Sequence, residues 1–189
     1  MSPSTPPYAP FYCEENIWQL STAAALPSPR AVLVISNPLH CVAIAHQRIA
    51  PTPGRPIVWD YHVILAAHTP TGWAIWDLDT TLGVPVPLGP YLRASFAYPD
   101  GFPPPFDARF RVVPAERYRQ TLCTDRSHML DEHGQHRAAP PPWPAIGTGT
   151  NLMRFVDTTA EFEGEVVPLT ELPAALDRLL GPEATRSPA

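Results

Sequence analysis

The chain has 189 residues, 44 % of them hydrophobic, so it is long and apolar enough to form one compact domain around a buried core. Its net charge of -5, with 13 arginines and no lysine, provides no basic stripe for a phosphate backbone and argues against nucleic-acid binding. No apolar run approaches the roughly 18 residues of a membrane span, and the first residues lack the apolar segment of a signal peptide. We therefore expect a cytoplasmic protein with no membrane or nucleic-acid partner.

The first predicted element is a helix over residues 12–20 (YCEENIWQL), with Glu14 and Glu15 in the first turn, where the helix dipole favours negative charge. This helix places Cys13 at its N-terminus. Residues 31–36 and 41–47 are apolar runs separated by Asn37 and Pro38, a pattern that predicts two strands of a hairpin.

Two further strands, residues 57–68 and 73–80, flank a turn over residues 69–72. If this turn sets the register, His68 faces Trp73, Ile64 faces Asp77 and His62 faces Asp79. One face then carries Asp60, His62, Ile64, Asp77 and Asp79, and the other carries Trp59, Tyr61, Val63, Leu65, Trp76 and Leu78. We expect the second face to be core and the first to carry chemistry.

The rest of the chain alternates strands and helices. The pattern predicts a strand over residues 110–113, a helix over 115–122 and a short helix over 151–155. A strand over 165–167 and a helix over 170–180, with Thr170 as its N-cap, complete the chain.

Cys13 is the first candidate for chemistry. Unpaired backbone N–H groups at a helix N-terminus lower the pKa of a thiol, whereas Glu14 and Glu15 raise it. Position alone also fits a buried small hydrophobe, which is our interpretation of Cys41. The three cysteines, with Cys123, form no CxxC pair, and their odd number argues against a disulfide framework.

His62 is the second candidate, because the register places two carboxylates within reach of its ring. Asp79 lies directly opposite and Asp77 diagonally opposite, and the register does not separate them. A carboxylate that orients an imidazole is the third member of a cysteine or serine triad. The alternative is a salt-bridge cluster on a solvated face.

Other groupings carry less chemistry. His40, Cys41 and His46 do not form a metal site in our interpretation, because neighbouring strand residues point to opposite faces. His128 belongs to a polar stretch that could border a pocket or cap a helix, and Ser127 lacks the G-x-S-x-G context of a nucleophile. Nothing in the sequence requires a metal or organic cofactor, so chelation should not abolish activity.

Seven segments together resemble the family of protein N-terminal glutamine amidohydrolases. They are Tyr12–Trp18 (YCEENIW), Pro53–Val63 (PGRPIVWDYHV), Trp76–Thr80 (WDLDT), Phe110–Val113 (FRVV), Asp125–Met129 (DRSHM), Pro140–Pro144 (PPPWP), and Asn151-Leu152 with Phe155. The likeness extends over about residues 11–180, in order.

The resemblance implies an α/β (α+β) fold of the transglutaminase-like or papain-like kind, with a central, mostly antiparallel sheet flanked by helices. It implies the catalytic triad Cys13, His62 and Asp77, and it is the resemblance that selects Asp77 over Asp79. We expect one catalytic domain over residues 11–181, between a disordered tail over 1–10 and a flexible tail over 182–189.

The family acts on glutamine at a protein N-terminus and releases ammonia, so the implied partner is a protein or peptide with a free N-terminal glutamine. We expect the chain itself to be a monomer. A carboxylate would recognise the free α-ammonium. The candidates are Glu14, Asp60, Asp79 and Asp125. A cysteine peptidase or a transglutaminase with the same triad, and a non-catalytic peptide-binding module, remain the alternatives.

Overall fold

A six-stranded sheet forms the centre of the computed structural model, which describes residues 7–181. Its strands lie in the order β6 (Val86–Pro87), β5 (Gly72–Trp76), β4 (His62–Thr69), β1 (Arg30–Ser36), β7 (Arg109–Pro114) and β8 (Glu165–Pro168). All neighbouring strands are antiparallel. The expected tail residues 1–6 and 182–189 lie outside the described part of the chain.

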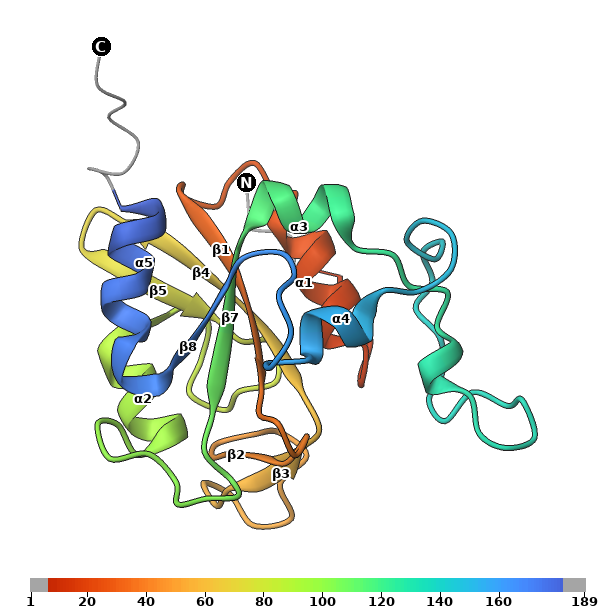
Figure 1. Ribbon diagram of the computed structural model, residues 1–189, viewed down its shortest axis with the longest axis horizontal. Coiled ribbons are helices and arrows are strands. Elements are labelled where there is room, and N and C mark those ends of the chain that lie inside the picture. The colour runs from red at the N-terminus through yellow and green to blue at the C-terminus, as the bar shows by residue number, and fades with distance from the viewer. Residues whose placement is uncertain (1–6, 182–189) are drawn as a thin grey trace.

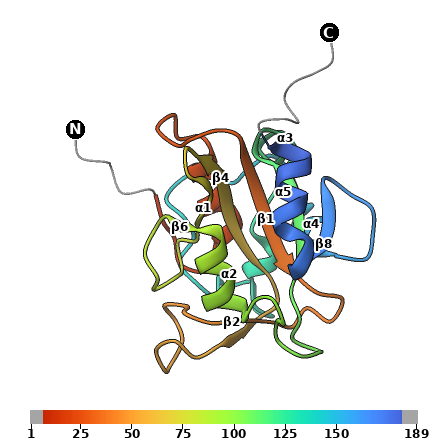
Figure 2. The same cartoon turned by 90° about the vertical axis from the view of Figure 1, so that its left-hand side faces the viewer.

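Helices cover both faces of this sheet (Figures 1 and 2). On one face lie α1 (Cys13–Ser21), α3 (Ala115–Thr121) and α4 (Leu152–Val156), and on the other lie α2 (Leu88–Phe96) and α5 (Leu172–Leu180). The mixed α/β fold with an antiparallel sheet between helices is therefore confirmed. Among residues 7–181, no helix has the length and apolar character that crossing a bilayer requires.

Both sheet faces are apolar core, which corrects the expectation that one face carries the chemistry. Leu33 and Ile35 of β1 pack with α2 and α5, whereas Val32 and Val34 pack with α1, α3 and α4. A strand buried on both faces appears as a continuous apolar run, as β1 does. Polar groups that take part in chemistry are therefore confined to strand ends and the loops beyond them.

The predicted helices and strands are present, most with ends within two residues of the prediction. The start of the last helix differs, because a 3-10 helix (η2, Leu169–Glu171) precedes α5 and Glu171 is its N-cap. Thr170 lies inside η2, so its predicted capping role is wrong. Pro173 fits the first turn of α5, where its missing N–H costs no hydrogen bond.

The predicted hairpin of residues 31–36 and 41–47 is wrong. β1 pairs with β4 and β7, whereas β2 (Val42–Ile44) pairs with β3 (Ile57–Trp59) in a separate two-stranded sheet. The Asn37 amide nitrogen donates to the carbonyls of Cys41, Pro105 and Asp107, so the chain leaves the main sheet at this residue.

The β4–β5 register is confirmed at His68, which pairs with Trp73, but the ladder ends at Trp76. The expected pairs of Ile64 with Asp77 and of His62 with Asp79 do not form. The cause is local, because the Asp77 carboxylate accepts the Asp79 backbone N–H and turns the chain out of the strand.

Trp59 also departs from its predicted face. β3 ends at Trp59, and β4 begins only at His62, so residues 60–61 break the long strand that the pattern predicts. Trp59 consequently packs on the α2 side of the sheet and stacks on the His62 ring.

Arg111 of β7 is the largest fully buried side chain, at 1 % exposure. Its guanidinium donates to the carbonyls of Phe155 (2.9 Å), Ala160 (3.0 Å), Glu163 (3.3 Å) and Asp157. One side chain therefore provides hydrogen-bond donors for backbone carbonyls at the end of α4 and in the loop between α4 and β8, which lie outside regular secondary structure or at its end.

Replacing Arg111 by methionine should lower the free energy of unfolding by about 3 kcal/mol or more, because several buried carbonyls lose their donor together. Urea denaturation followed by circular dichroism measures this change. Arg178→Met is the matched control, since Arg178 makes a two-point ion pair with Glu165 on the surface and should matter little. Equal effects of the two substitutions would contradict this role of Arg111.

Candidate active site

The start of α1, the start of β4 and the turn after β5 meet at one cavity of about 400 Å³. Its lining includes Cys13 of α1, Asp60 before β4 and Asp79 after β5, together with His128 of a distant segment. The fold therefore brings most of the candidate residues identified from the sequence to one end of the sheet.

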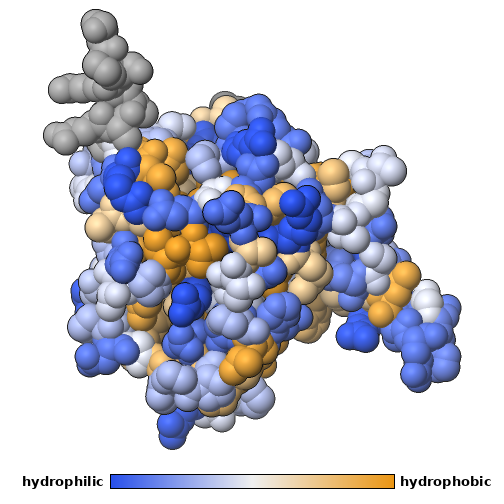
Figure 3. Space-filling model, viewed as in Figure 1, coloured by the Kyte–Doolittle hydropathy of each residue, from blue (hydrophilic) through white to orange (hydrophobic). Residues whose placement is uncertain are grey.

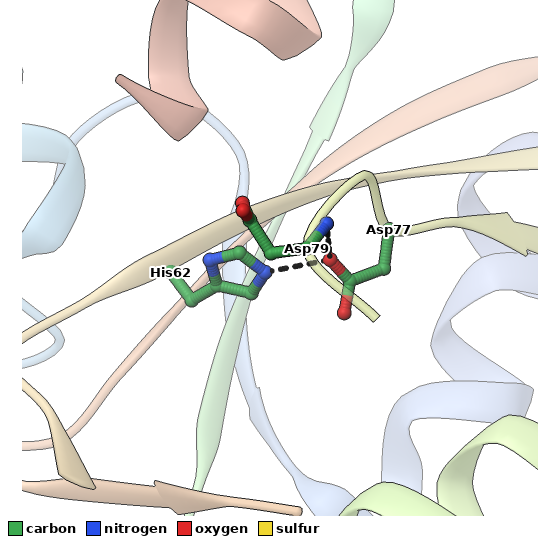
Figure 4. Close-up of side chains that lie close together, drawn as sticks. All are labelled: His62, Asp77 and Asp79. Atoms are coloured by element: carbon green, nitrogen blue, oxygen red, sulfur yellow. Dashed lines mark hydrogen bonds and ion pairs between the residues drawn. The ribbon is translucent and has the colours of Figure 1, made fainter. Parts of the chain in front are cut away.

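His62 and Asp77 form a buried pair beside this cavity. Their side chains are 1 % and 0 % exposed, and His62 Nε2 lies 2.9 Å from Asp77 Oδ1. Figure 4 shows the imidazole and the Asp77 carboxylate pointing toward each other, with the Asp79 carboxylate turned away from Asp77, on the side of the His62 ring. The pair has the geometry of a carboxylate that fixes the orientation and tautomer of an imidazole.

Asp77 is held by four donors. Its Oδ1 accepts from His62 and from the Asp79 backbone N–H (2.9 Å), and its Oδ2 accepts from Gln47 Nε2 (3.1 Å) and the Tyr91 hydroxyl (2.8 Å). Burial alone would raise the pKa of Asp77, but the charge and hydrogen bond of His62, with the other donors, lower it. Asp77 is therefore a carboxylate when the protein is folded.

The opposite balance acts on His62. Burial alone would lower its pKa, but the charge and hydrogen bond of Asp77, together with the charge of Asp79, raise it. Trp59 stacks on the ring at 5.4 Å between centroids and 15° between planes. The other ring nitrogen, Nδ1, is buried and has no hydrogen-bond partner within residues 7–181, so it is the atom free to exchange a proton.

Cys13 begins α1 and is 8 % exposed at the cavity. Burial raises the pKa of its thiol well above the usual value, the charges of Glu14, Asp79 and Asp60 add to this rise, and a backbone hydrogen bond at Val63 opposes it. The net direction is opposite to the one that a helix N-terminus favours, and burial is its largest cause. The resting thiol is therefore protonated.

The remaining acidic candidates lie in different surroundings. Asp60 is exposed and Asp79 is 6 % exposed, and both line the cavity. Glu14 is fully buried behind Cys13, where its Oε2 accepts from the Tyr61 hydroxyl at 3.3 Å. Asp125 is exposed, accepts the Ser127 backbone N–H and does not line the cavity.

His128 borders the cavity, as its polar stretch suggested. Its Nε2 lies 3.4 Å from Glu14 Oε1, within ion-pair distance but without hydrogen-bond geometry. Arg126 of the same stretch makes a two-point ion pair with Glu15 (2.8 Å each), and Trp143 donates to the same carboxylate at 2.8 Å. These contacts hold the segment over residues 123–147 against α1.

This segment projects from the body of the protein (Figures 1 and 3). Besides His128, it contributes Met129, Arg137 and Ala138 to the cavity lining. Sequence patterns did not indicate Arg137, because it lies in a polar stretch without periodicity.

Three further residues were missed by the sequence analysis. Gln47 and Tyr91 hold Asp77, and the Tyr8 hydroxyl donates to Asp79 Oδ1 at 2.5 Å. All three act across long separations in the chain, so a local pattern carries no signal for them.

The ligand atoms of His62, Asp77 and Asp79 lie within 4.8 Å of one another, which is compact enough to consider a metal ion. Both Asp77 oxygens already accept two hydrogen bonds each, however, and the set therefore fits an oriented imidazole better than an ion. Within the described chain, His40, Cys41 and His46 form no such group.

The model of the N-terminal glutamine amidase family matches residues 8–176. The protein N-terminal glutamine amidohydrolase of Homo sapiens is 38 % identical over 167 residues, which cover 82 % of this chain and 80 % of that protein. The proteins of the same name from Bos taurus (37 % over 166 residues; 82 % and 80 % covered) and Caenorhabditis elegans (32 % over 167 residues; 85 % and 89 % covered) are similar too. These matches confirm the resemblance found in the sequence.

The His62–Asp77 pair makes a testable prediction about proton binding. Because Asp77 outweighs burial, the His62 imidazolium should persist to a higher pH than an unperturbed histidine, and Asp77→Asn should reverse this, leaving burial to lower the pKa. Nitrogen-15 NMR titration of the ring measures both directions. Asp125→Asn, which removes an exposed carboxylate away from the cavity, is the control and should leave the His62 titration unchanged. An unchanged pKa of His62 in Asp77→Asn would contradict the pairing.

Proposed function

This chain belongs to the N-terminal glutamine amidase family, and on that premise we propose that it hydrolyses the side-chain amide of an N-terminal glutamine on proteins or peptides. The products are an N-terminal glutamate and ammonia. The observation that supports this most is the buried His62–Asp77 pair beside a cavity that Cys13 lines.

In this proposal Cys13 is the nucleophile, because it lines the cavity while Cys41 and Cys123 do not. His62 is the acid and base through Nδ1, the ring nitrogen left free by the bond from Nε2 to Asp77. Asp77 orients the ring and stabilises its charged form, since Asp77 itself remains a carboxylate.

The reaction follows in two halves. The Cys13 thiolate attacks the side-chain carboxamide carbon, and the His62 imidazolium protonates the departing nitrogen, so that the C–N bond breaks and ammonia leaves. A thioester between Cys13 and the glutamyl side chain remains. His62 then takes a proton from a water molecule, the hydroxide attacks the thioester carbon, and the C–S bond breaks to return Cys13 and release glutamate.

The first residue of a helix has a backbone N–H without an acceptor inside the helix. Cys13 occupies this position in α1, so its own N–H is the proposed donor to the oxyanion that forms in both halves. A nucleophile on a helix that packs against an antiparallel sheet bearing His62 also supports the transglutaminase-like, or papain-like, assignment of the fold.

The activity is tested with a peptide that begins with glutamine, beside its acetylated form and a peptide with internal glutamine. Only the peptide with a free N-terminal glutamine should release ammonia and show the increase in mass expected when OH replaces NH₂. Cys13→Ala should lose about ten-thousandfold or more in rate, because it removes the nucleophile.

Cys41→Ser is the matched control, since Cys41 lies outside the cavity, and it should retain the activity. Peptide cleavage or cross-linking instead of ammonia release would replace the proposal by a peptidase or a transglutaminase. Binding of the peptide without turnover, unchanged in Cys13→Ala, would indicate a non-catalytic module.

The thioester can be intercepted with hydroxylamine, which attacks the same carbon as water. Turnover of the glutamine peptide in hydroxylamine should yield the γ-hydroxamate at the expense of glutamate, because both products arise from one acyl intermediate. Mass spectrometry separates the two products, and the glutamate peptide incubated with enzyme and hydroxylamine is the control. Hydrolysis that continues with no hydroxamate would contradict a covalent intermediate.

A further inference from the structure

We propose that Asp79 binds the α-ammonium of the substrate and that this pairing switches on Cys13, so that a free N-terminus is an activator as well as a recognition element. The substrate identity in this inference rests on the proposed function. The role of Asp79 itself rests on its place in the cavity and on the charges around Cys13 and His62.

Asp79 offers the cavity a free carboxylate oxygen. Its Oδ1 is held by the Tyr8 hydroxyl at 2.5 Å, whereas its Oδ2 makes no hydrogen bond to any residue in 7–181 and is not fully buried. The side chain is only 6 % exposed, so an ammonium bound there would be largely shielded from water. A charge-assisted hydrogen bond is stronger where water is excluded, because the local dielectric constant is low.

The reach of glutamine agrees with this position. The α-nitrogen lies four bonds from the carboxamide carbon, within about 5 Å, so the ammonium must bind close to the reacting sulfur. Asp79 lines the same cavity as Cys13, and one of its oxygens lies within 4.8 Å of a His62 ring nitrogen.

The other carboxylates fit less well. Glu14 is fully buried outside the cavity lining, Asp60 is exposed and already accepts the Tyr61 backbone N–H, and Asp125 lies elsewhere. An exposed carboxylate discriminates weakly between a charged and an acetylated amine, because water and salt screen it.

Charges around the two reacting groups are mostly negative. The titratable side chains that face Cys13 are Glu14, Asp60, Tyr61, Asp79, Tyr118 and His128. Asp77 and Asp79 face His62, and Arg137 adds one positive charge to the cavity lining. Among these groups, Asp79 is the carboxylate that acts on both Cys13 and His62 while remaining open to the cavity.

The sign of its effect follows from electrostatics. At Cys13, burial and then the charge of Glu14 raise the pKa of the thiol, and the charge of Asp79 adds to this rise. At His62, burial lowers the pKa, the charge and hydrogen bond of Asp77 raise it, and the charge of Asp79 raises it further. At rest the two groups therefore hold one proton more than the thiolate–imidazolium pair that attacks. An ammonium on Asp79 cancels its charge, lowers both pKa values, and lets the surplus proton leave.

Asp79→Asn should combine a more reactive thiol with weaker substrate binding. Asp79→Asn should make Cys13 more reactive toward iodoacetamide at neutral pH, while kcat/KM for the glutamine peptide falls about ten- to a hundredfold through KM. Alkylation measured over a range of pH separates this effect from a damaged fold, because exposure of the buried thiol raises the rate at every pH, whereas loss of the Asp79 charge moves the profile to lower pH. Asp125→Asn is the control, because it removes an exposed carboxylate that does not line the cavity and should leave both quantities nearly unchanged.

The activation is measured on the wild type without turnover. The probe is glycyl-glycinamide, which has an α-ammonium but no side chain to cover the thiol, beside acetyl-glycyl-glycinamide. Peptide mass spectrometry locates the alkylation on Cys13. The pH profile of this alkylation should move to lower pH with the free amine and stay in place with the acetylated one. In Asp79→Asn, neither compound should move the profile.

A profile that the free amine does not move, or that still moves in Asp79→Asn, overturns the inference. These outcomes are separate from the proposed function, because alkylation needs no glutamine hydrolysis. Turnover of glutamine peptides with an unmoved profile would leave the amidase proposal intact and reject the role of Asp79. A shifted profile without turnover would support the role of Asp79 and reject the amidase proposal.

Discussion

The ion pair of His62 and Asp77 is the interaction on which the rest of the site depends. A buried carboxylate is costly unless its oxygens are satisfied, and here four donors from four parts of the chain converge on it. Tyr91 of α2 and Gln47 beyond β2 reach it from outside the main sheet. The pair therefore connects the start of β4 to the packing of α2 and fixes which nitrogen of His62 is free.

The first turn of α1 arranges the opposite wall. Cys13 faces the cavity, and Glu15 binds Arg126 and Trp143 of the projecting segment. Asn16 exchanges two hydrogen bonds of 2.8 Å with the backbone of Ala9. One helical turn therefore presents the thiol and anchors both segments that border the cavity. Burial of Cys13 raises the pKa of its thiol and the charge of the neighbouring Glu14 adds to this rise, so the positive charge of a bound ammonium would act against it.

Local patterns predicted most of the elements, because their causes are local, but they did not predict β6 and α2. The acidic first turn and apolar spacing place α1 correctly, and the turn length sets His68 opposite Trp73. The sequence could not separate Asp77 from Asp79, since both lie on one side of a regular strand. Their roles differ only because β5 ends at Trp76, and the bend there turns the two side chains in different directions.

The remaining failures have long-range causes. Asn37 binds carbonyls of residues 105 and 107, which no inspection of residues 31–47 could reveal, and so the predicted hairpin does not form. The same holds for Gln47, Tyr91 and Tyr8, which contact the two aspartates only after the sheet is assembled. Residue types in the sequence were enough to identify candidate residues for the reaction. Only the tertiary structure shows which of them are buried, paired or open to the cavity.

The central claim is that Cys13 attacks the side chain of an N-terminal glutamine held at this cavity. The most direct measurement uses a peptide whose first residue is a diazoketone analogue of glutamine, which alkylates a nucleophile positioned at the carboxamide carbon. Mass spectrometry after digestion should find the label on Cys13 alone, and none when the amine of the peptide is acetylated. A label on Cys41 or Cys123, or an unlabelled protein that still deamidates glutamine peptides, would contradict the account.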